Sequence, residues 1–347
     1  MTHRLACLII AAAAAHAPLA SAQTPPPAPT APAVQQPPAP PPVYVPTSLA
    51  AEPGLPRTPE GHPDFQGVRW TTNFFPVFAA TPMAATLVVS EAEAKKMADM
   101  MVQGMLASKD PNITVDPEIP ELIKQTSGLP VVRGERRTRL VVLPADGKIP
   151  WVQAARNEAN ALDWSKIPAD NPENRPSSER CTALAGLAPI PSTPGLNPLE
   201  FIQSRGYVVI HTEFGDESRI IPFTDKHGAA ALQPRLGDAI ARWDGDTLVI
   251  ETINPPPQDR IRGQPKLVVG VNAKVIERFT RLSKDEMLYQ FTIEDPTSYS
   301  APWLAEYPLQ RTDKPLFPYS CHEGNYSLPN ILSGQRVAEA RAQASAK

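Results

Sequence analysis

Strand signals separated by short turns fill the chain between residues 201 and 313. The clearest is AIARWDGDTLVIETIN (239–254), in which two β-rich runs flank Asp244–Gly245, a dipeptide typical of tight hairpins. Similar runs occupy 201–215, 218–223, 274–296 and 303–313. The spacing predicts a mainly β fold, an antiparallel meander that closes into a barrel or sandwich, lipocalin-like in general shape, with a few peripheral helices.

The first 22 residues have the layout of a signal peptide. Arg4 precedes an apolar run from Leu8 to Ala15, and Ala20–Ala22 supplies the small residues at which such peptides are cleaved. The run is too short to remain in a bilayer, and no other stretch is long and apolar enough for a membrane helix. We therefore expect an exported protein, periplasmic or secreted, without an integral membrane segment.

Proline dominates the next segment, residues 23–57. Because proline lacks a backbone N–H and favours the extended polyproline II conformation, this segment is predicted to be a semi-rigid tether. A ligand for a proline-recognising partner is the alternative. The remaining residues, 58–347, are predicted to form a single β-rich domain.

One helix is expected within this domain, at about 90–106. Ser90 and Glu93 have the spacing of a capping box at its start. Methionines recur at helical spacing along it, which predicts a face packed on the core rather than a copper site. They are Met97, Met100, Met101 and Met105.

Two cysteines remain once the signal peptide, which contains Cys7, is removed. An isolated pair in an oxidising compartment usually forms a disulfide, so we expect a bond between Cys181 and Cys321. The enclosed loop is long, and the chain-entropy model gives such a bond about 4–5 kcal/mol of stability. A metal site that uses Cys321 and His322 is the alternative, although the spacing matches no zinc signature.

Charge and motifs argue against several classes of function. Cleavage removes one of the 33 Lys and Arg residues and none of the 36 Asp and Glu residues, so the net charge becomes 32 − 36 = −4. Because the chain has no basic block, nucleic acid is not an expected partner. The sequence contains no GxGxxG, GxSxG or HExxH motif, and no cofactor is implied.

Several stretches together resemble a widespread group of exported bacterial proteins of unassigned function. The stretches are PDFQGVRW, YVVIHTEFGDESRIIP, RWDGDTLVIETIN, FTIEDPTSYSAPW and CHEGNY. The resemblance covers roughly residues 61–335. It implies no established activity, so the functional expectations depend on residue chemistry.

Polar residues interrupt the apolar strands and are candidate ligand contacts. His211 and Glu213 lie two apart, so on a strand they share a face with Tyr207. Arg219, on the next strand, is placed to reach Glu213 across a short hairpin, and Glu251 lies on a later strand. These side chains either line a ligand cavity or form cross-strand pairs on a solvated face.

Further carboxylates lie on the later strands. For Glu277 and Glu294 we favour cross-strand pairs on a solvated face over a place in a ligand cavity. Glu294–Asp295 is expected to begin the turn at Pro296.

The stretch CHEGNY (321–326) concentrates reactive side chains beside the expected disulfide. His322 could act as a general acid or base, together with Glu213 and His211, and Gly324 permits a sharp turn. The predicted arrangement is a structural corner that presents His322 to a pocket shared with His211 or Glu213. Asn325 and Tyr326 are further ligand-contact candidates. The alternatives are a purely structural turn and a metal site of His211, Glu213 and His322.

These features favour a cavity that binds a small, partly apolar molecule outside the cytoplasm. The first alternative is a lyase, isomerase or hydrolase that needs no cofactor and uses His and Glu acid–base chemistry. The second is a structural or interaction protein of the cell envelope.

Overall fold

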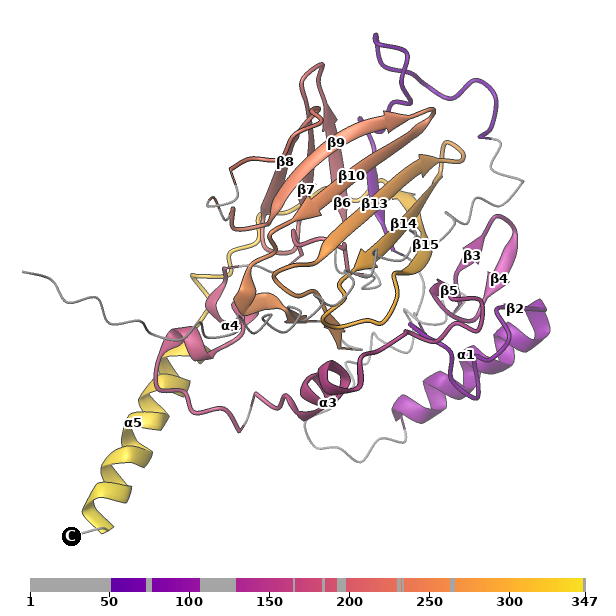
Figure 1. Ribbon diagram of the computed structural model, residues 1–347. Coiled ribbons are helices and arrows are strands. Elements are labelled where there is room, and N and C mark those ends of the chain that lie inside the picture. The colour runs from indigo at the N-terminus through magenta and orange to yellow at the C-terminus, as the bar shows by residue number, and fades with distance from the viewer. Residues whose placement is uncertain are drawn as a thin grey trace, which may run out of the picture. The chain divides into compact units, whose positions relative to one another are not determined.

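Nine strands form one long antiparallel path, which confirms the predicted mainly β fold (Figure 1). They are β1 (Arg69–Thr71), β6 (Leu199–Gln203), β7 (Tyr207–Thr212), β8 (Glu217–Pro222), β9 (Asp238–Asp244), β10 (Thr247–Ile253), β13 (Lys274–Arg281), β14 (Glu286–Glu294) and β15 (Trp303–Thr312). Their order in the sheet is β8-β7-β6-β1-β15-β14-β13-β10-β9, and β5 (Val141–Leu143) pairs with β15 beside this path. The predicted hairpins at 239–254 and 274–296 are therefore present.

The computed structural model describes most of the predicted domain. The described ranges are 51–72, 77–106, 129–164, 166–182, 185–191, 198–229, 232, 234–262 and 266–345. The predicted signal peptide and all of the tether before residue 51 lie outside them. All described residues belong to one unit, which spans 40–347.

The run at 201–215, expected as one extended segment, contains two strands. Strands β6 and β7 form a hairpin around the turn at residues 204–206. The hydroxyl of Ser204 accepts a hydrogen bond from the backbone N–H of Tyr207 and donates one to its carbonyl. Local bonds of this kind compete with a continuous strand, which explains the difference from the expectation.

The sheet curls until its two outermost strands, β8 and β9, come together. Because nine strands alternate in direction along the path, the first and the last run the same way, so any contact between them has to be parallel. The bridge found between these edges, from Phe223 to Ala241, is parallel. No ladder joins β8 to β9 in the part of the chain that the structure describes, so a hydrogen-bonded closed barrel is not found.

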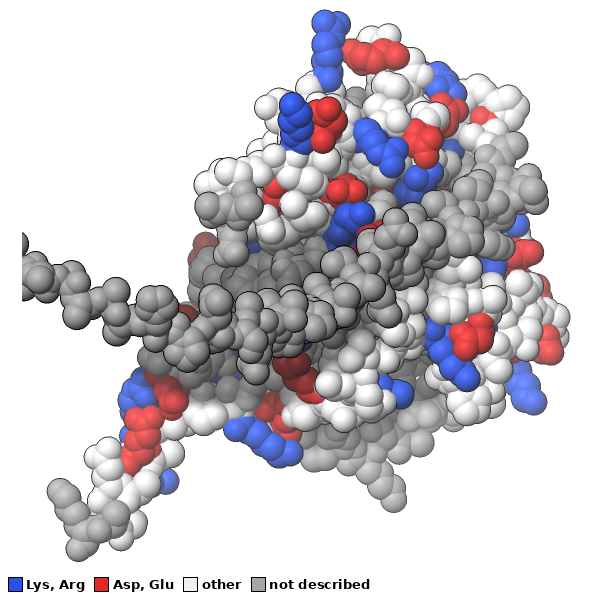
Figure 2. Space-filling view, viewed as in Figure 1, with Lys and Arg blue, Asp and Glu red and all other residues white. Residues whose placement is uncertain are grey.

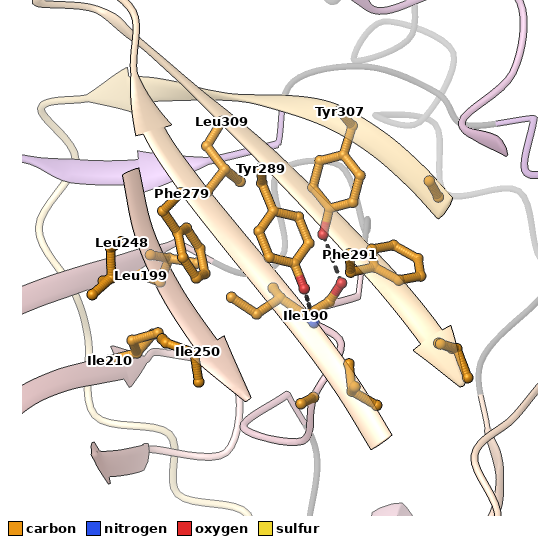
Figure 3. Close-up of a cluster of buried hydrophobic side chains, with 14 of the residues drawn as sticks. Ile190, Leu199, Ile210, Leu248, Ile250, Phe279, Tyr289, Phe291, Tyr307 and Leu309 are labelled. Carbon is orange, nitrogen blue, oxygen red and sulfur yellow. Dashed lines mark hydrogen bonds between the residues drawn. The ribbon is translucent and has the colours of Figure 1, made fainter. Parts of the chain in front are cut away.

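Apolar side chains on the inner face of the sheet form the core (Figure 3). Alternate residues of each strand point inward, as the pleat requires, and on β14 these are Met287, Tyr289, Phe291 and Ile293. Neighbouring strands contribute Leu199, Ile210, Leu248, Ile250, Phe279 and Leu309. Burying each large apolar side chain stabilises the fold by about 1.5–3 kcal/mol, so this layer fixes the strand register.

The predicted helix is α1 (Glu91–Leu106), which accompanies a small sheet of β2 (Val88–Val89), β3 (Val131–Val132) and β4 (Glu135–Arg137). The capping box is confirmed. The Ser90 N–H donates to Oε2 of Glu93, and the Glu93 N–H donates to Oγ of Ser90. Two backbone donors at the helix start are thereby paired.

The methionine face of α1 is confirmed only in part. Met97 is buried against Ala94 and Leu129, whereas Met100 is 44 % exposed. The side chains of Met101 and Met105 lie outside the described residues. The helix therefore buries a short stripe.

The remaining elements are short, except for the C-terminal helix. They are α3 (Gln153–Ala161), η1 (Pro172–Asn174), α4 (Ser177–Arg180), η2 (Pro257–Asp259), β11 (Ile261–Arg262), β12 (Leu267–Val268) and α5 (Ser327–Ser345). None of the helices in the described ranges has the length and apolar content that crossing a bilayer requires. On the described surface visible in Figure 2, basic and acidic side chains are interspersed.

The Asp295 side chain organises the turn after β14, as the sequence predicted. One carboxylate oxygen accepts hydrogen bonds from the N–H and hydroxyl of Thr297, and the other accepts one from the Gly270 N–H. Burial alone would raise the pKa of Asp295, but these hydrogen bonds outweigh it and lower the pKa below its usual value.

We expect Asp295→Asn to cost about 1–3 kcal/mol of folding free energy at neutral pH, since it removes a charged acceptor of three hydrogen bonds, one of them the buried bond from the Gly270 N–H. A lowered pKa stabilises the fold above the unfolded-state value, about 3.9, and this contribution is lost as the pH falls through the folded-state value. Urea unfolding at pH 7 and at pH 3 should therefore show a smaller difference between variant and parent at pH 3. An equal difference at both pH values would contradict this role.

Candidate functional site

A cleft opens where the sheet fails to close. It has a volume of about 250 Å³ and lies between β8 and the segment that leads into β9. Ser218 to Ile221 form one wall, and Pro234 to Gly237, with Ala239, form the other. We call it the seam cleft. Its walls combine apolar side chains with two arginines, Arg219 and Arg235, the composition of a small-molecule site.

Arg219 connects the seam cleft to a buried ion pair. Its side chain points inward and donates to both carboxylate oxygens of Glu277, at 3.1 and 2.5 Å, and to the hydroxyl of Thr252 at 3.2 Å. Arg219 is 4 % exposed and Glu277 is fully buried. Burial by itself would lower the pKa of Arg219, but the Glu277 carboxylate outweighs it, and the pKa is raised. Arg219 therefore remains charged.

Two tyrosines extend this pair into the core. The hydroxyl of Tyr289 donates to Oε1 of Glu277 at 2.8 Å, and the hydroxyl of Tyr307 donates to the carbonyl of Ile190 at 2.6 Å. Burial, and secondarily the charge of Glu277, raises the pKa of both tyrosines. They remain protonated and act as hydrogen-bond donors.

Residues 185–191 form an irregular segment that lies against this network. The N–H of Ile190 donates to the hydroxyl of Tyr289 at 2.9 Å (Figure 3). Because Tyr289 in turn donates to Glu277, a continuous chain of hydrogen bonds runs from the segment through Tyr289 to Glu277. Arg262 donates to the carbonyl of Ala188 at 2.7 Å. Burial lowers the pKa of Arg262 to about 10, so it is still charged at neutral pH.

A second ion pair holds the same segment beside the seam cleft. Glu217 accepts hydrogen bonds from Arg235 at 2.6 Å and from the N–H groups of Ala185 and Gly186 at 3.0 and 2.7 Å. A Cβ at Gly186 would lie 3.0 Å from the Cβ of Glu217, so the close approach depends on this glycine. Arg235 is thus fixed at one end, while its side chain is 53 % exposed.

The register of the β7–β8 hairpin corrects the predicted set of His211, Glu213 and Arg219. His211 lies opposite Ser218, and Arg219 lies opposite Ile210. His211 and Arg219 therefore point to opposite faces of the sheet. Glu213 follows the end of β7, and its carboxylate accepts the N–H of Phe317 at 2.8 Å instead of pairing with Arg219.

Two other predicted ligand contacts lie on the outer face. Tyr207 is 51 % exposed. Glu251 pairs with His227 at 3.3 Å, and the other ring nitrogen of His227 lies 3.4 Å from Asp238. This arrangement is a cross-strand surface cluster, the second of the two interpretations that the sequence left open.

The stretch 321–326 forms the expected structural corner. Cys181 and Cys321 are joined by a disulfide, which confirms that prediction. The amide of Asn325 donates to the carbonyl of Glu179 at 2.6 Å, which ties the corner to α4.

The corner does not present its histidine to the predicted pocket. His322 is exposed, and Tyr326 is 75 % exposed. No described hydrogen bond or ion pair joins His322 to His211 or Glu213. The expected shared pocket is therefore wrong, because the disulfide and Asn325 hold the corner while the histidine points to solvent.

Sequence reasoning misjudged Glu277 and missed Glu217 and Arg235. Glu277 is not on a solvated face but is fully buried, whereas Glu294 forms the expected cross-strand pair, with Lys274 at 2.9 Å. A signal was present, because Glu277 stands between Val275 and Phe279 on the same face of an apolar strand.

Within the described ranges, no group of three or more His, Cys, Asp or Glu side chains is arranged to hold a metal ion, so the alternative site of His211, Glu213 and His322 gains no support. Comparisons with family models, curated proteins and solved structures returned no match for this chain. The resemblance to a group of exported proteins therefore stays a prediction, and the functional argument depends on the geometry.

Proposed function

We propose that the protein binds a small, partly apolar molecule in the seam cleft, outside the cytoplasm. The observation that carries this proposal is the unclosed edge of the sheet, where a cleft lies between β8 and the segment before β9. Ile220, Leu236 and Ala239 supply apolar contact there. The disulfide supports a location outside the reducing cytoplasm.

The charge beside the seam cleft narrows the ligand class. Arg235 has five N–H donors, and a side chain that is half exposed keeps some of them facing solvent after it pairs with Glu217. An apolar body with a carboxylate or similar anionic group matches these walls. The volume, about 250 Å³, lies below the range of about 300–1,000 Å³ that is usual for drug-sized ligands, which favours a small molecule.

The acid–base alternative has less support than binding. It required His322, His211 and Glu213 to meet at one pocket. In the structure His322 is exposed, His211 contacts Ser218, and Glu213 accepts a hydrogen bond from the N–H of Phe317. The groups beside the seam cleft are paired arginines and carboxylates, which recognise and hold a ligand.

Octanoate is a suitable first probe, with octanol as its uncharged counterpart. We expect calorimetry to show that octanoate binds and that Leu236→Trp, which fills the cleft, weakens binding at least tenfold, a loss of about 1.4 kcal/mol. Arg235→Lys keeps the charge but loses the forked donor geometry, so it should weaken octanoate more than octanol.

Ile202→Trp is the matched control, because Ile202 is 50 % exposed on β6 and does not line the cleft. This variant should bind octanoate like the parent. Failure of octanoate to bind, or equal loss in the Leu236 and Ile202 variants, would remove the seam cleft as the site.

A further inference from the structure

The disulfide lies next to the groups that hold the exposed arginine of the seam cleft. Cys181 follows α4, and the carbonyl of the next residue, Thr182, accepts a hydrogen bond from Arg235. A short way along the chain, the N–H groups of residues 185–186 bind Glu217, the other partner of Arg235. The chain after Cys181 therefore contacts Arg235 both directly and through Glu217.

The backbone of Cys181 is held in an unfavourable conformation. Its φ is +55° and its ψ is +35°, in the left-handed region that residues other than glycine adopt at an energetic cost. The bond to Cys321 fixes Cys181 there, and Asn325 ties the corner around Cys321 to the carbonyl of Glu179 in α4. Opening the disulfide removes this restraint, so Cys181 relaxes and the chain that follows it shifts.

The disulfide is open to attack by a thiol. Cys181 and Cys321 are both partly exposed, and the residues on each side of Cys321, 318–320 and 322–324, are exposed. The side-chain amide of Asn325 donates a hydrogen bond to Sγ of Cys181 at 3.4 Å. A donor at this sulfur stabilises the thiolate that leaves when the bond breaks, and a more stable leaving thiolate exchanges faster. Attack at Cys321 is therefore favoured, with Cys181 as the leaving group.

We propose that the Cys181–Cys321 disulfide is a redox switch for ligand binding in the seam cleft. The inference rests on the function proposed above and adds its regulation. In the oxidised protein Arg235 is held in place for an anionic group. In the reduced protein the chain after Cys181 shifts, Arg235 loses the Thr182 carbonyl, and the ligand binds more weakly.

The reductant of the switch is a dithiol. Its first thiolate attacks Sγ of Cys321 and forms a mixed disulfide, while the bond to Cys181 breaks and Cys181 leaves as a thiolate that takes up a proton. The second thiolate then attacks the reductant's own sulfur in the mixed disulfide and releases Cys321, which is protonated in turn. Two electrons and two protons pass to the protein, and the dithiol becomes a disulfide.

The test compares octanoate binding to the oxidised and the reduced mature protein by calorimetry at low temperature. Dithiothreitol is the reductant, and mass spectrometry after alkylation shows that both thiols are free. We expect reduction to weaken octanoate binding by about tenfold or more. Octanol does not need Arg235, so it should lose less than about threefold. The double variant Cys181→Ser, Cys321→Ser should bind octanoate like the reduced protein, with or without dithiothreitol.

Linkage provides a second measurement on the same protein. A ligand that binds the oxidised form about tenfold more tightly shifts the equilibrium between disulfide and dithiol toward the disulfide by the same factor, about 30 mV for a two-electron couple. Equilibration in dithiothreitol redox buffers, with and without saturating octanoate, measures this shift. Saturating octanol should produce a smaller one.

A monothiol identifies the sulfur that is attacked. Brief treatment with glutathione, followed by alkylation and peptide mapping, should place glutathione on Cys321 and the alkyl group on Cys181. Asn325→Asp keeps the shape of the side chain but removes the donor, so it should slow reduction by about threefold or more. Asn330→Asp makes the same charge change on α5 and should be reduced at the parent rate. Glutathione on Cys181 instead would overturn the assigned direction of attack.

The remaining outcomes separate the switch from the site. If octanoate does not bind the oxidised protein, the function proposed for the seam cleft fails and the switch fails with it. If octanoate binds both forms equally and leaves the redox equilibrium unchanged, the site stands and the switch is overturned. Equal losses of octanoate and octanol would overturn the role of Arg235. Unfolding of the reduced protein would show that the bond is only a structural cross-link.

Discussion

Glu277→Gln should lower the free energy of unfolding by about 3–5 kcal/mol, because it leaves the charge of Arg219 buried without its counter-ion. Arg219 is bonded to Glu277 through both carboxylate oxygens, and the two side chains are almost inaccessible to water. Urea denaturation at neutral pH, followed by tryptophan fluorescence, gives the difference directly.

The replacement of both partners provides the decisive comparison. Arg219→Met with Glu277→Leu removes both charges, so the double variant should lose less stability than the sum of the single variants, by several kcal/mol. Glu294→Gln is the matched control, since the partly exposed pair Lys274–Glu294 joins the same strand, β13, to β14 and should be worth about 0–1 kcal/mol. If the single variants of Arg219 and Glu277 lose no more stability than Glu294→Gln, the buried ion pair does not have the stabilising role described.

The buried pair Arg219–Glu277 also illustrates which features of the structure can be predicted from the sequence and which cannot. The antiparallel hairpins follow from turn dipeptides and β-rich runs, which are local signals, and the structure contains them. The face that a residue occupies depends on the register of its strand, which a shift of one position inverts. His211 and Arg219 illustrate this, because the turn between β7 and β8 places Ser218 opposite the histidine.

The parts of the site that come from distant segments had no local signal. Residues 185–191 have neither helical nor alternating periodicity, yet they contribute the partners of Tyr289, Tyr307 and Glu217. The stacking of His62 on Trp243 joins a loop to a strand far along the chain. Contacts of this kind arise when the sheet curls, and local patterns in a single sequence do not specify them. The disulfide, by contrast, was predictable from the sequence, because only two cysteines remain once the predicted signal peptide is removed.

Removal of that disulfide should have the other large effect. Cys181 and Cys321 are 140 residues apart in the chain, and their Cα atoms lie 5.8 Å apart. Without the cross-link the unfolded chain gains conformational entropy. We therefore expect Cys181→Ser to lower the free energy of unfolding by about 2–5 kcal/mol. Cys321→Ser and the double variant should lose the same amount, because each removes the same cross-link, and reduction of the parent protein should reproduce the loss.

The position of the disulfide predicts which part of the chain becomes less protected when the bond is lost. Cys181 precedes the segment 185–191, whose Ile190 N–H donates to Tyr289, so loss of the cross-link should speed hydrogen exchange at Ile190 more than at Phe279 in the middle of β13. Mass spectrometry under non-reducing conditions provides the control, since the parent must lack free thiols. If the variant loses less than about 1 kcal/mol, with Ile190 as protected as before, then the hydrogen bonds to Glu217 and the tyrosines hold this segment without the cross-link.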